Sequence, residues 1–162
     1  MRKKHLPFMG VGPVYVIIII LMTIAGIWAS ENGFIIKVTY WYFYIPVVVI
    51  GIALILLGFF FWYSANAHSK LDENIKNNNL ITTGVYAYVR NPVYSAFLMM
   101  CTGILLFANN VCLLALPVVY WGFMTVLMKF TEEKWLANLY GSEYIEYCKI
   151  VNRCIPFFKK HF

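Results

Sequence analysis

Charged side chains are scarce in this chain of 162 residues: 12% are Asp, Glu, Lys or Arg, whereas 62% are hydrophobic. An ordinary soluble domain has about 25% charged and roughly 45 to 50% apolar residues. Charges are missing altogether from residues 5–30, 38–69 and 91–128. Since one membrane-spanning helix needs only about 20 apolar residues, this distribution excludes a water-soluble globular protein and predicts an integral membrane protein.

The sequence also has few signals for metals, disulfides or nucleic acid. Its four cysteines (Cys101, Cys112, Cys148 and Cys154) form no CxxC pair and no Cys/His set with zinc-ligand spacing, so we expect neither a metal site nor disulfides. The net charge of +6 comes from basic residues placed singly or in pairs beside apolar runs. A nucleic-acid-binding face would cluster them, so we expect no nucleic-acid partner.

The longest uncharged window, residues 91–128, is too long for one membrane crossing. As a single helix it would extend about 57 Å, against a hydrocarbon core of about 30 Å. Asn109 and Asn110 supply a polar turn in its middle. We therefore predict a short helical hairpin made of residues 93–108 and 111–128.

Two further spans, at residues 12–29 and 40–63, complete the expected fold. This is an all-α integral membrane protein of about four transmembrane helices, the last two forming the hairpin, followed by C-terminal interfacial helices. Of the 13 Lys and Arg residues, 12 then fall on one side and only Lys37 on the other. Because positive charge favours the cytoplasmic side, we predict that both termini are cytoplasmic.

We expect one domain, residues 1–162, because most of the chain is membranous. Residues 1–63 would provide two transmembrane helices. Residues 64–162 would provide a polar loop, the hairpin and a cytoplasmic C-terminal segment. The other side receives only a short loop and the Asn-Asn turn, so an active site should face the cytoplasm.

The start of the hairpin is a candidate anion site. Asn91 can cap a helix whose first turn holds Pro92, and the free N–H groups there favour a carboxylate. Arg90 could bind the same carboxylate bidentately, and Gly84 would let the backbone turn and approach a ligand. The alternative is that Arg90 only reaches lipid phosphates and Gly84 only turns the chain.

Adjacent carboxylates, Glu132 and Glu133, follow the last apolar span. Neighbouring helix positions point in different directions, so one carboxylate can face inward and the other outward. We expect a helix along the membrane interface that Gly141 ends, with Ser142 capping the next one. Glu133 and Glu146 would pair with nearby lysines on a solvated face.

Several short motifs follow one another between about residues 78 and 158. They are Leu80-Ile81-Thr82-Thr83-Gly84-Val85-Tyr86, Arg90-x-Pro92-x-Tyr94, the hydrophobic hairpin, Glu132-Glu133, Gly141-x-Glu143-Tyr144-x-x-Tyr147 and Ile155-Pro156-Phe157. In order, spacing and membrane context they resemble the isoprenylcysteine carboxyl methyltransferase family and its phospholipid N-methyltransferase relatives. The resemblance covers roughly half of the chain.

The resemblance implies a membrane methyltransferase that uses S-adenosylmethionine. The cofactor would lie on the cytoplasmic side, and a lipophilic or lipidated acceptor would enter from the bilayer among the membrane lipids. Carried over by position, the cofactor-binding residues would be Leu80, Ile81, Tyr86, Arg90, Asn91, Pro92, Tyr94 and Glu132.

Two of these residues, Arg90 and Glu132, would be the catalytic contacts. Arg90 suits the cofactor's carboxylate, whereas Glu132 suits its cationic amine and ribose hydroxyls. Lys129 is the candidate for binding the acceptor, because it stands next to the position where the eukaryotic enzymes have a substrate-binding arginine.

The identity of the methyl acceptor stays open at this point. No His lies within the motifs, which favours a carboxylate or thiol of an isoprenoid-like lipid, since neither needs a strong base. A phospholipid amine is the main alternative. An NADPH-dependent sterol-type reductase would need more cationic groups, and a non-enzymatic membrane protein would not need these motifs.

Overall fold

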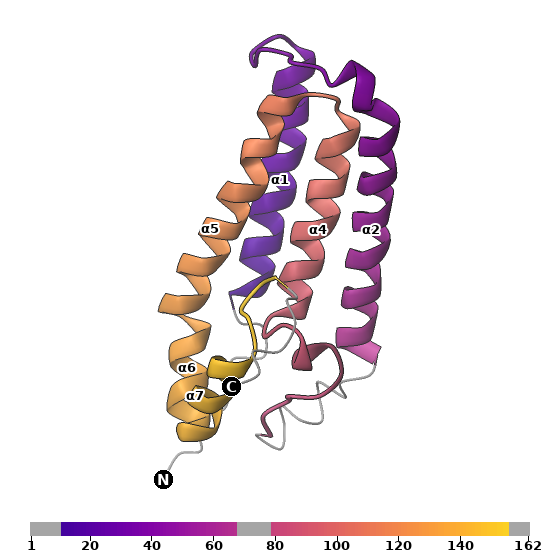
Figure 1. Ribbon diagram of the computed structural model, residues 1–162. Coiled ribbons are helices and arrows are strands. Elements are labelled where there is room, and N and C mark those ends of the chain that lie inside the picture. Colours follow the sequence, from indigo (N-terminus) through magenta and orange to yellow (C-terminus); the bar gives the residue numbers. More distant parts are fainter. Residues whose placement is uncertain (1–10, 68–78, 156–162) are drawn as a thin grey trace.

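A computed structural model describes residues 11–67 and 79–155 of the chain, and these residues form a helical bundle (Figure 1). The long helices lie side by side, and the short helices α6 and α7 lie together at one end. The α-helices are α1 (Gly12–Glu31), α2 (Tyr44–Ala67), α4 (Pro92–Phe107), α5 (Ala115–Phe130), α6 (Glu132–Tyr140) and α7 (Ser142–Ile150). Short 3-10 turns are η1 (Trp41–Phe43), η2 (Gly84–Ala87) and η3 (Val111–Leu114).

The predicted all-α membrane architecture is confirmed. Three helical stretches in the described part of the chain are long and apolar enough to cross a membrane: Gly12–Glu31, Trp41–Asn66 and Val111–Tyr140. The fourth predicted span is the shorter apolar helix Pro92–Phe107. The side of the membrane on which the termini lie stays a prediction.

The turn between α4 and α5 lies at Asn109 and Asn110, as predicted. Asn109 has a left-handed φ of 48°, a conformation that asparagine tolerates better than most residues. The fully buried Asn110 side chain accepts from the N–H groups of Cys112 (3.0 Å) and Val38 (3.2 Å) and donates to Ser30 Oγ (2.8 Å). This amide therefore joins the α4–α5 turn to the α1–α2 connection.

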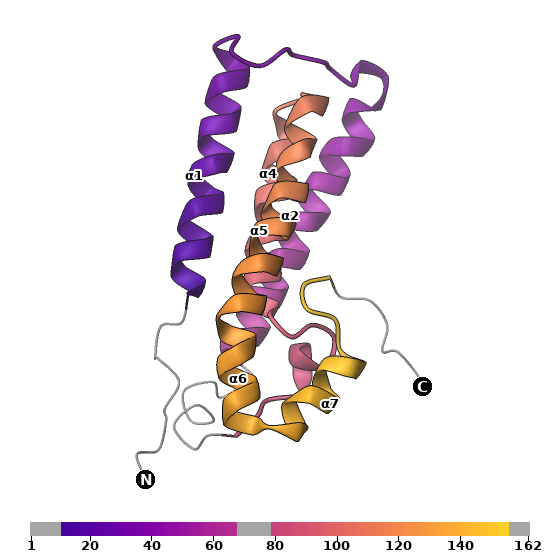
Figure 2. The same ribbon diagram turned by 90° about the vertical axis from the view of Figure 1, so that its left-hand side faces the viewer.

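Helices α2 and α4 form the closest pair, and α4 lies between α1 and α2 in contact with both (Figure 2). The backbones of α2 and α4 come closest at glycine residues. A Cβ atom on Gly103 would lie 2.6 Å from the Gly51 carbonyl oxygen, and one on Gly58 would lie 2.7 Å from the Ala96 carbonyl oxygen. Small residues let transmembrane helices approach in this way where lipid offers no hydrophobic driving force.

The junction between α6 and α7 differs from the prediction in one detail. Gly141 ends α6, as expected, with a φ of 57° that favours glycine. Ser142 does not cap α7, because Gly141 itself occupies the N-cap position and Ser142 is the first helical residue. The sharp glycine turn joins the two helices directly and leaves no place for a separate cap.

After α7 the chain returns to the start of α4. We call residues 151–154 the C-terminal strap. Asn152 forms an isolated parallel bridge with Val89, and its carbonyl oxygen accepts from the N–H of Arg90 (2.9 Å). Beyond it, Pro156 and Phe157 of the last sequence motif lie outside the described residues.

The close α2–α4 contact predicts that Gly103→Ala destabilises the protein, because a methyl group there would collide with backbone. The expected loss is about 1–3 kcal/mol, measured as a lower unfolding temperature in detergent. Gly122→Ala in α5 is the matched control, since a Cβ atom at Gly122 meets nothing within 4 Å. Equal unfolding temperatures for both variants would contradict the contact.

Candidate functional site

The segments that carry the predicted site residues lie at the end of the bundle where α4 begins (Figures 1 and 2). Five other segments meet there: the start of α1, the turn η2, helices α6 and α7, and the C-terminal strap. Thr131 separates α5 from α6, and its hydroxyl donates to the Leu127 carbonyl oxygen (2.5 Å). Two adjacent carboxylates, Glu132 and Glu133, follow this break and belong to two different polar clusters.

The start of α4 is held by the strap. Pro92 is buried in the first turn, as predicted, and Asn91 occupies the N-cap position. The Asn91 side chain makes no capping hydrogen bond to the helix, however. Its Nδ2 donates to the Arg153 carbonyl oxygen (3.1 Å), and its backbone N–H donates to the same oxygen (3.2 Å), so two donors of Asn91 bind the strap.

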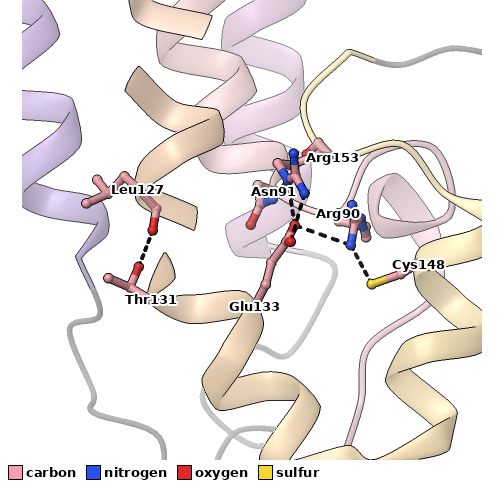
Figure 3. Close-up of polar contacts among 7 residues, drawn as sticks. All are labelled: Arg90, Asn91, Leu127, Thr131, Glu133, Cys148 and Arg153. Carbon is pink, nitrogen blue, oxygen red and sulfur yellow. Dashed lines mark hydrogen bonds and ion pairs between the residues drawn. The ribbon is translucent and has the colours of Figure 1, made fainter. Parts of the chain in front are cut away.

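The first cluster surrounds Glu133 (Figure 3). Arg153 binds this carboxylate bidentately, with Nε 2.6 Å from Oε1 and Nη2 2.8 Å from Oε2. Arg90 approaches Oε1 through Nη1 at 3.3 Å, and the same Nη1 donates to the Sγ of Cys148. The hydrogen bond to Glu133 raises the pKa of Arg153 above its ordinary value.

The Glu133 cluster is largely buried and carries surplus positive charge. The Arg90 side chain is 9% exposed, that of Glu133 15% and that of Arg153 24%. Two guanidinium groups therefore share one carboxylate. Within residues 11–67 and 79–155 the buried Nε of Arg90 finds no hydrogen-bond partner.

The pairing of Glu133 differs from the expectation. We expected lysine partners on a solvated face, and the structure places two arginines there instead. Glu146 does pair with a lysine, Lys149, at 2.6 Å on the exposed side of α7. Arg153 was missed because it lies 20 residues from Glu133, and only the return of the chain through the strap brings the two together.

The second cluster surrounds Glu132. The Tyr94 hydroxyl donates to its Oε1 (2.7 Å), and the backbone N–H groups of Val11 and Gly12 are also hydrogen-bonded to this carboxylate. A carboxylate at the start of a helix such as α1 is favourable, because the N–H groups there lack partners within the helix. A Cβ atom on Gly12 would lie 2.3 Å from the Tyr94 hydroxyl oxygen, so a side chain at this position would displace the Tyr94 ring.

The turn η2 connects the two clusters. The Tyr147 hydroxyl of α7 donates to the Tyr86 carbonyl oxygen (2.6 Å). Burial raises the pKa of the Tyr86 phenol, and the nearby Tyr147 and Glu132 raise it further. Leu80 packs against Tyr144 and Tyr147. The predicted residues Tyr86, Tyr94 and Glu132 therefore lie together.

Three other predicted positions are less enclosed. Ile81 is half-buried, and Gly84 has a φ of 62°, so it does turn the chain as expected. Lys129 is exposed in the last turn of α5, and no hydrogen bond or ion pair among the described residues joins it to either cluster. In the same part of the chain no group of three His, Cys, Asp or Glu residues is placed to hold a metal ion.

The two clusters have complementary chemistry. Glu133 and its two arginines carry surplus positive charge. Glu132 is a carboxylate that lies beside Tyr94 and Tyr86. The carboxylates belong to successive residues at the start of α6. Together the clusters suit a small ligand that carries both a carboxylate and a cationic group.

Comparisons with known proteins point to methyl transfer. The family model described as phospholipid methyltransferase matches residues 37–143. The chain is 34% identical over 83 residues to protein-S-isoprenylcysteine O-methyltransferase B of Arabidopsis thaliana, covering 51% of this chain and 42% of that protein. It is 35% identical over 91 residues to the protein-S-isoprenylcysteine O-methyltransferase of Schizosaccharomyces pombe, covering 56% and 38%.

A longer match is to a probable protein-S-isoprenylcysteine O-methyltransferase of Oryza sativa subsp. indica, with 31% identity over 127 residues. It covers 73% of this chain and 63% of that protein. The chain thus spans less than two thirds of the length of these relatives. No solved structure matches it.

The bond between Tyr94 and Glu132 predicts a clear loss of stability for Tyr94→Phe. A hydrogen bond to a charged group contributes about 1.5–3 kcal/mol, so the unfolding temperature in detergent should fall. Tyr88→Phe is the matched control, because Tyr88 is 57% exposed. If the two variants unfold at the same temperature, the carboxylate does not depend on Tyr94.

Proposed function

Because the chain belongs to the phospholipid methyltransferase family, we propose that it is a membrane methyltransferase that uses S-adenosylmethionine to methylate a lipophilic acceptor. Bound at the site, this cofactor would supply an electrophilic methyl group on a sulfonium. Its amino-acid end carries both a carboxylate and an ammonium group. Those are the two charges that the two clusters complement.

The incomplete pairing of Arg90 is the observation that carries the proposal. A buried charge is costly unless it is paired and hydrogen-bonded. Arg90 shares Glu133 with Arg153 at a long 3.3 Å, and its Nε has no partner among the described residues. A ligand carboxylate would complete its hydrogen bonds, and the N-terminus of α4, which follows directly, would add to the attraction.

Glu132 is the proposed partner of the cofactor's cationic amine or ribose hydroxyls. An ionised carboxylate offers about four acceptor positions. Tyr94, Val11 and Gly12 supply three donors, which leaves room for one more from a ligand. Glu132 would therefore have two tasks, holding the start of α1 and orienting the cofactor.

Other side chains would form the walls of the cofactor site. We propose Leu80 and Ile81 as apolar contacts and the rings of Tyr86 and Tyr94 as faces that stabilise a sulfonium by cation–π attraction. Asn91 and Pro92 would contribute the helix start. These residues would exclude water and fix the direction in which the methyl group points.

The favoured acceptor is a carboxylate or thiol on an isoprenoid-like lipid. The curated relatives are named protein-S-isoprenylcysteine O-methyltransferases, and an acceptor that is already ionised, as a carboxylate or a thiolate, attacks without a base. Its oxygen or sulfur would bond to the methyl carbon as the carbon–sulfonium bond breaks, releasing S-adenosylhomocysteine. Lys129 is the proposed contact for the acceptor's negative charge.

A phospholipid amine is the second candidate acceptor, and the family model's name favours it. The comparisons favour either acceptor over a sterol-type reductase or a non-enzymatic role. We also propose that the end of the bundle holding α6 and α7 faces the cytoplasm, because nearly all Lys and Arg residues would then be cytoplasmic. The whole of residues 1–162 would act as one catalytic domain.

Calorimetry on detergent-purified protein tests the proposal. We expect S-adenosylhomocysteine to bind in the micromolar range and NADPH not to bind. Arg90→Ala should weaken S-adenosylhomocysteine binding about tenfold or more, because a charge-assisted bidentate contact exceeds the 1.4 kcal/mol that corresponds to tenfold.

The control is Lys149→Ala, which removes a cation from an exposed pair on α7 and should leave binding unchanged. Binding of NADPH alone would replace the methyltransferase proposal with the reductase alternative. Methyl transfer to S-farnesylcysteine, compared with phosphatidylethanolamine vesicles, then distinguishes the two acceptors.

A further inference from the structure

The two arginines of the Glu133 cluster do not share the carboxylate equally. Arg153 uses both oxygens, at 2.6 and 2.8 Å, in the forked geometry that gives arginine–carboxylate pairs their strength. Arg90 reaches only Oε1, at 3.3 Å, and that oxygen already accepts from Arg153 Nε. Glu133 is therefore neutralised mainly by Arg153.

We propose that Arg153 is a positioning residue that keeps Arg90 available for an anionic ligand. With Arg153 in place, Glu133 holds Arg90 only weakly, and the Nε of the Arg90 guanidinium has no hydrogen-bond partner in residues 11–67 and 79–155. Without Arg153, both oxygens of Glu133 would be free to take Arg90 in a bidentate pair. The identification of the ligand as the cofactor's carboxylate rests on the proposed function, whereas the competition between the two arginines does not.

The strap fixes Arg153 relative to the ligand site. The Arg153 carbonyl oxygen accepts from both the N–H and the side-chain Nδ2 of Asn91, the residue next to Arg90. The neighbouring Cys154 carbonyl oxygen lies 2.5 Å from the Ser95 hydroxyl. The strap thus anchors Arg153 to the first turn of α4. The partner of Glu133 is therefore held next to the helix start that follows Arg90.

A purely structural ion pair would behave differently from this competition. If Arg153 only fastened the strap, removing it would weaken the fold, and removing Glu133 as well would repair nothing. If Arg153 instead frees Arg90 from Glu133, removing the Glu133 charge makes Arg153 dispensable. The double variant therefore distinguishes the two roles.

The experiment compares Arg153→Gln with Arg153→Gln/Glu133→Gln in detergent-purified full-length protein. We expect Arg153→Gln to weaken S-adenosylhomocysteine binding about tenfold, which corresponds to 1.4 kcal/mol, and the double variant to recover most of that loss. Arg153→Lys keeps the charge without the fork and should fall between wild type and Arg153→Gln. Lys149→Gln, from the exposed pair with Glu146, is the matched control.

A second readout does not depend on any cofactor. Arg90 Nη1 contacts the half-buried Cys148 Sγ, so the alkylation rate of Cys148 reports the position of the guanidinium. Cys112→Ser serves as the background, because Cys112 is the exposed cysteine of the four. In Arg153→Gln the guanidinium should move toward Glu133 and uncover the thiol, giving several-fold faster alkylation that the double variant reverses.

The outcomes separate the inference from the proposed function. Faster Cys148 alkylation in Arg153→Gln, reversed in the double variant, supports the positioning role even if wild type binds no S-adenosylhomocysteine, a result that would remove the proposed function alone. An alkylation rate unchanged from wild type in Arg153→Gln would overturn the positioning role. If wild type does bind S-adenosylhomocysteine, equally weak binding in the single and double variants would also overturn it.

Discussion

The bidentate pair between Arg153 and Glu133 is the interaction on which the arrangement of the site depends. It joins the C-terminal strap to the start of α6, while the strap's backbone binds the start of α4. Ion pairs on a wet surface contribute little. This one is largely shielded from water, and leaving either partner alone there would be costly. The pair therefore fixes the place where the strap, the start of α6 and the start of α4 meet.

Polar side chains brace the bundle at both of its ends. At one end Asn110 joins the α4–α5 turn to the α1–α2 connection. At the other end Glu132 joins α6 to α4 through Tyr94 and to α1 through Val11 and Gly12. Between the ends, the glycines of α2 and α4 bring two backbones together. The candidate site therefore belongs to a framework that holds all the long helices, and its residues serve stability besides the ligand binding that we propose for them.

The sequence was sufficient to predict the helices, because these follow from local patterns. The residues of the proposed ligand site came from the family resemblance, and their role in binding stays a prediction. The length of the uncharged window and the Asn109-Asn110 pair placed the hairpin, and Pro92 placed the start of α4. The contacts that could not be predicted join distant segments. Nothing near Glu133 in the sequence indicates Arg153 as its partner. Nothing near Gly12 indicates that the N–H groups at the start of α1 are hydrogen-bonded to Glu132. The side-chain partner of Asn91 depended on the same long-range geometry, whereas the role of Ser142 was decided locally by the turn at Gly141.

The position of Arg153 late in the chain also bears on biosynthesis. By the time this residue leaves the ribosome, the four long helices, Glu132 and Glu133 have already been synthesised. Arg90 and Glu133 can therefore meet first, and Arg153 can draw Glu133 away only after the bundle has formed. In a nascent chain that stalls or is cut before the strap, the Arg90 guanidinium would stay paired with the Glu133 carboxylate. A chain that has the strap would then differ from one that lacks it in whether Arg90 is available to the proposed ligand.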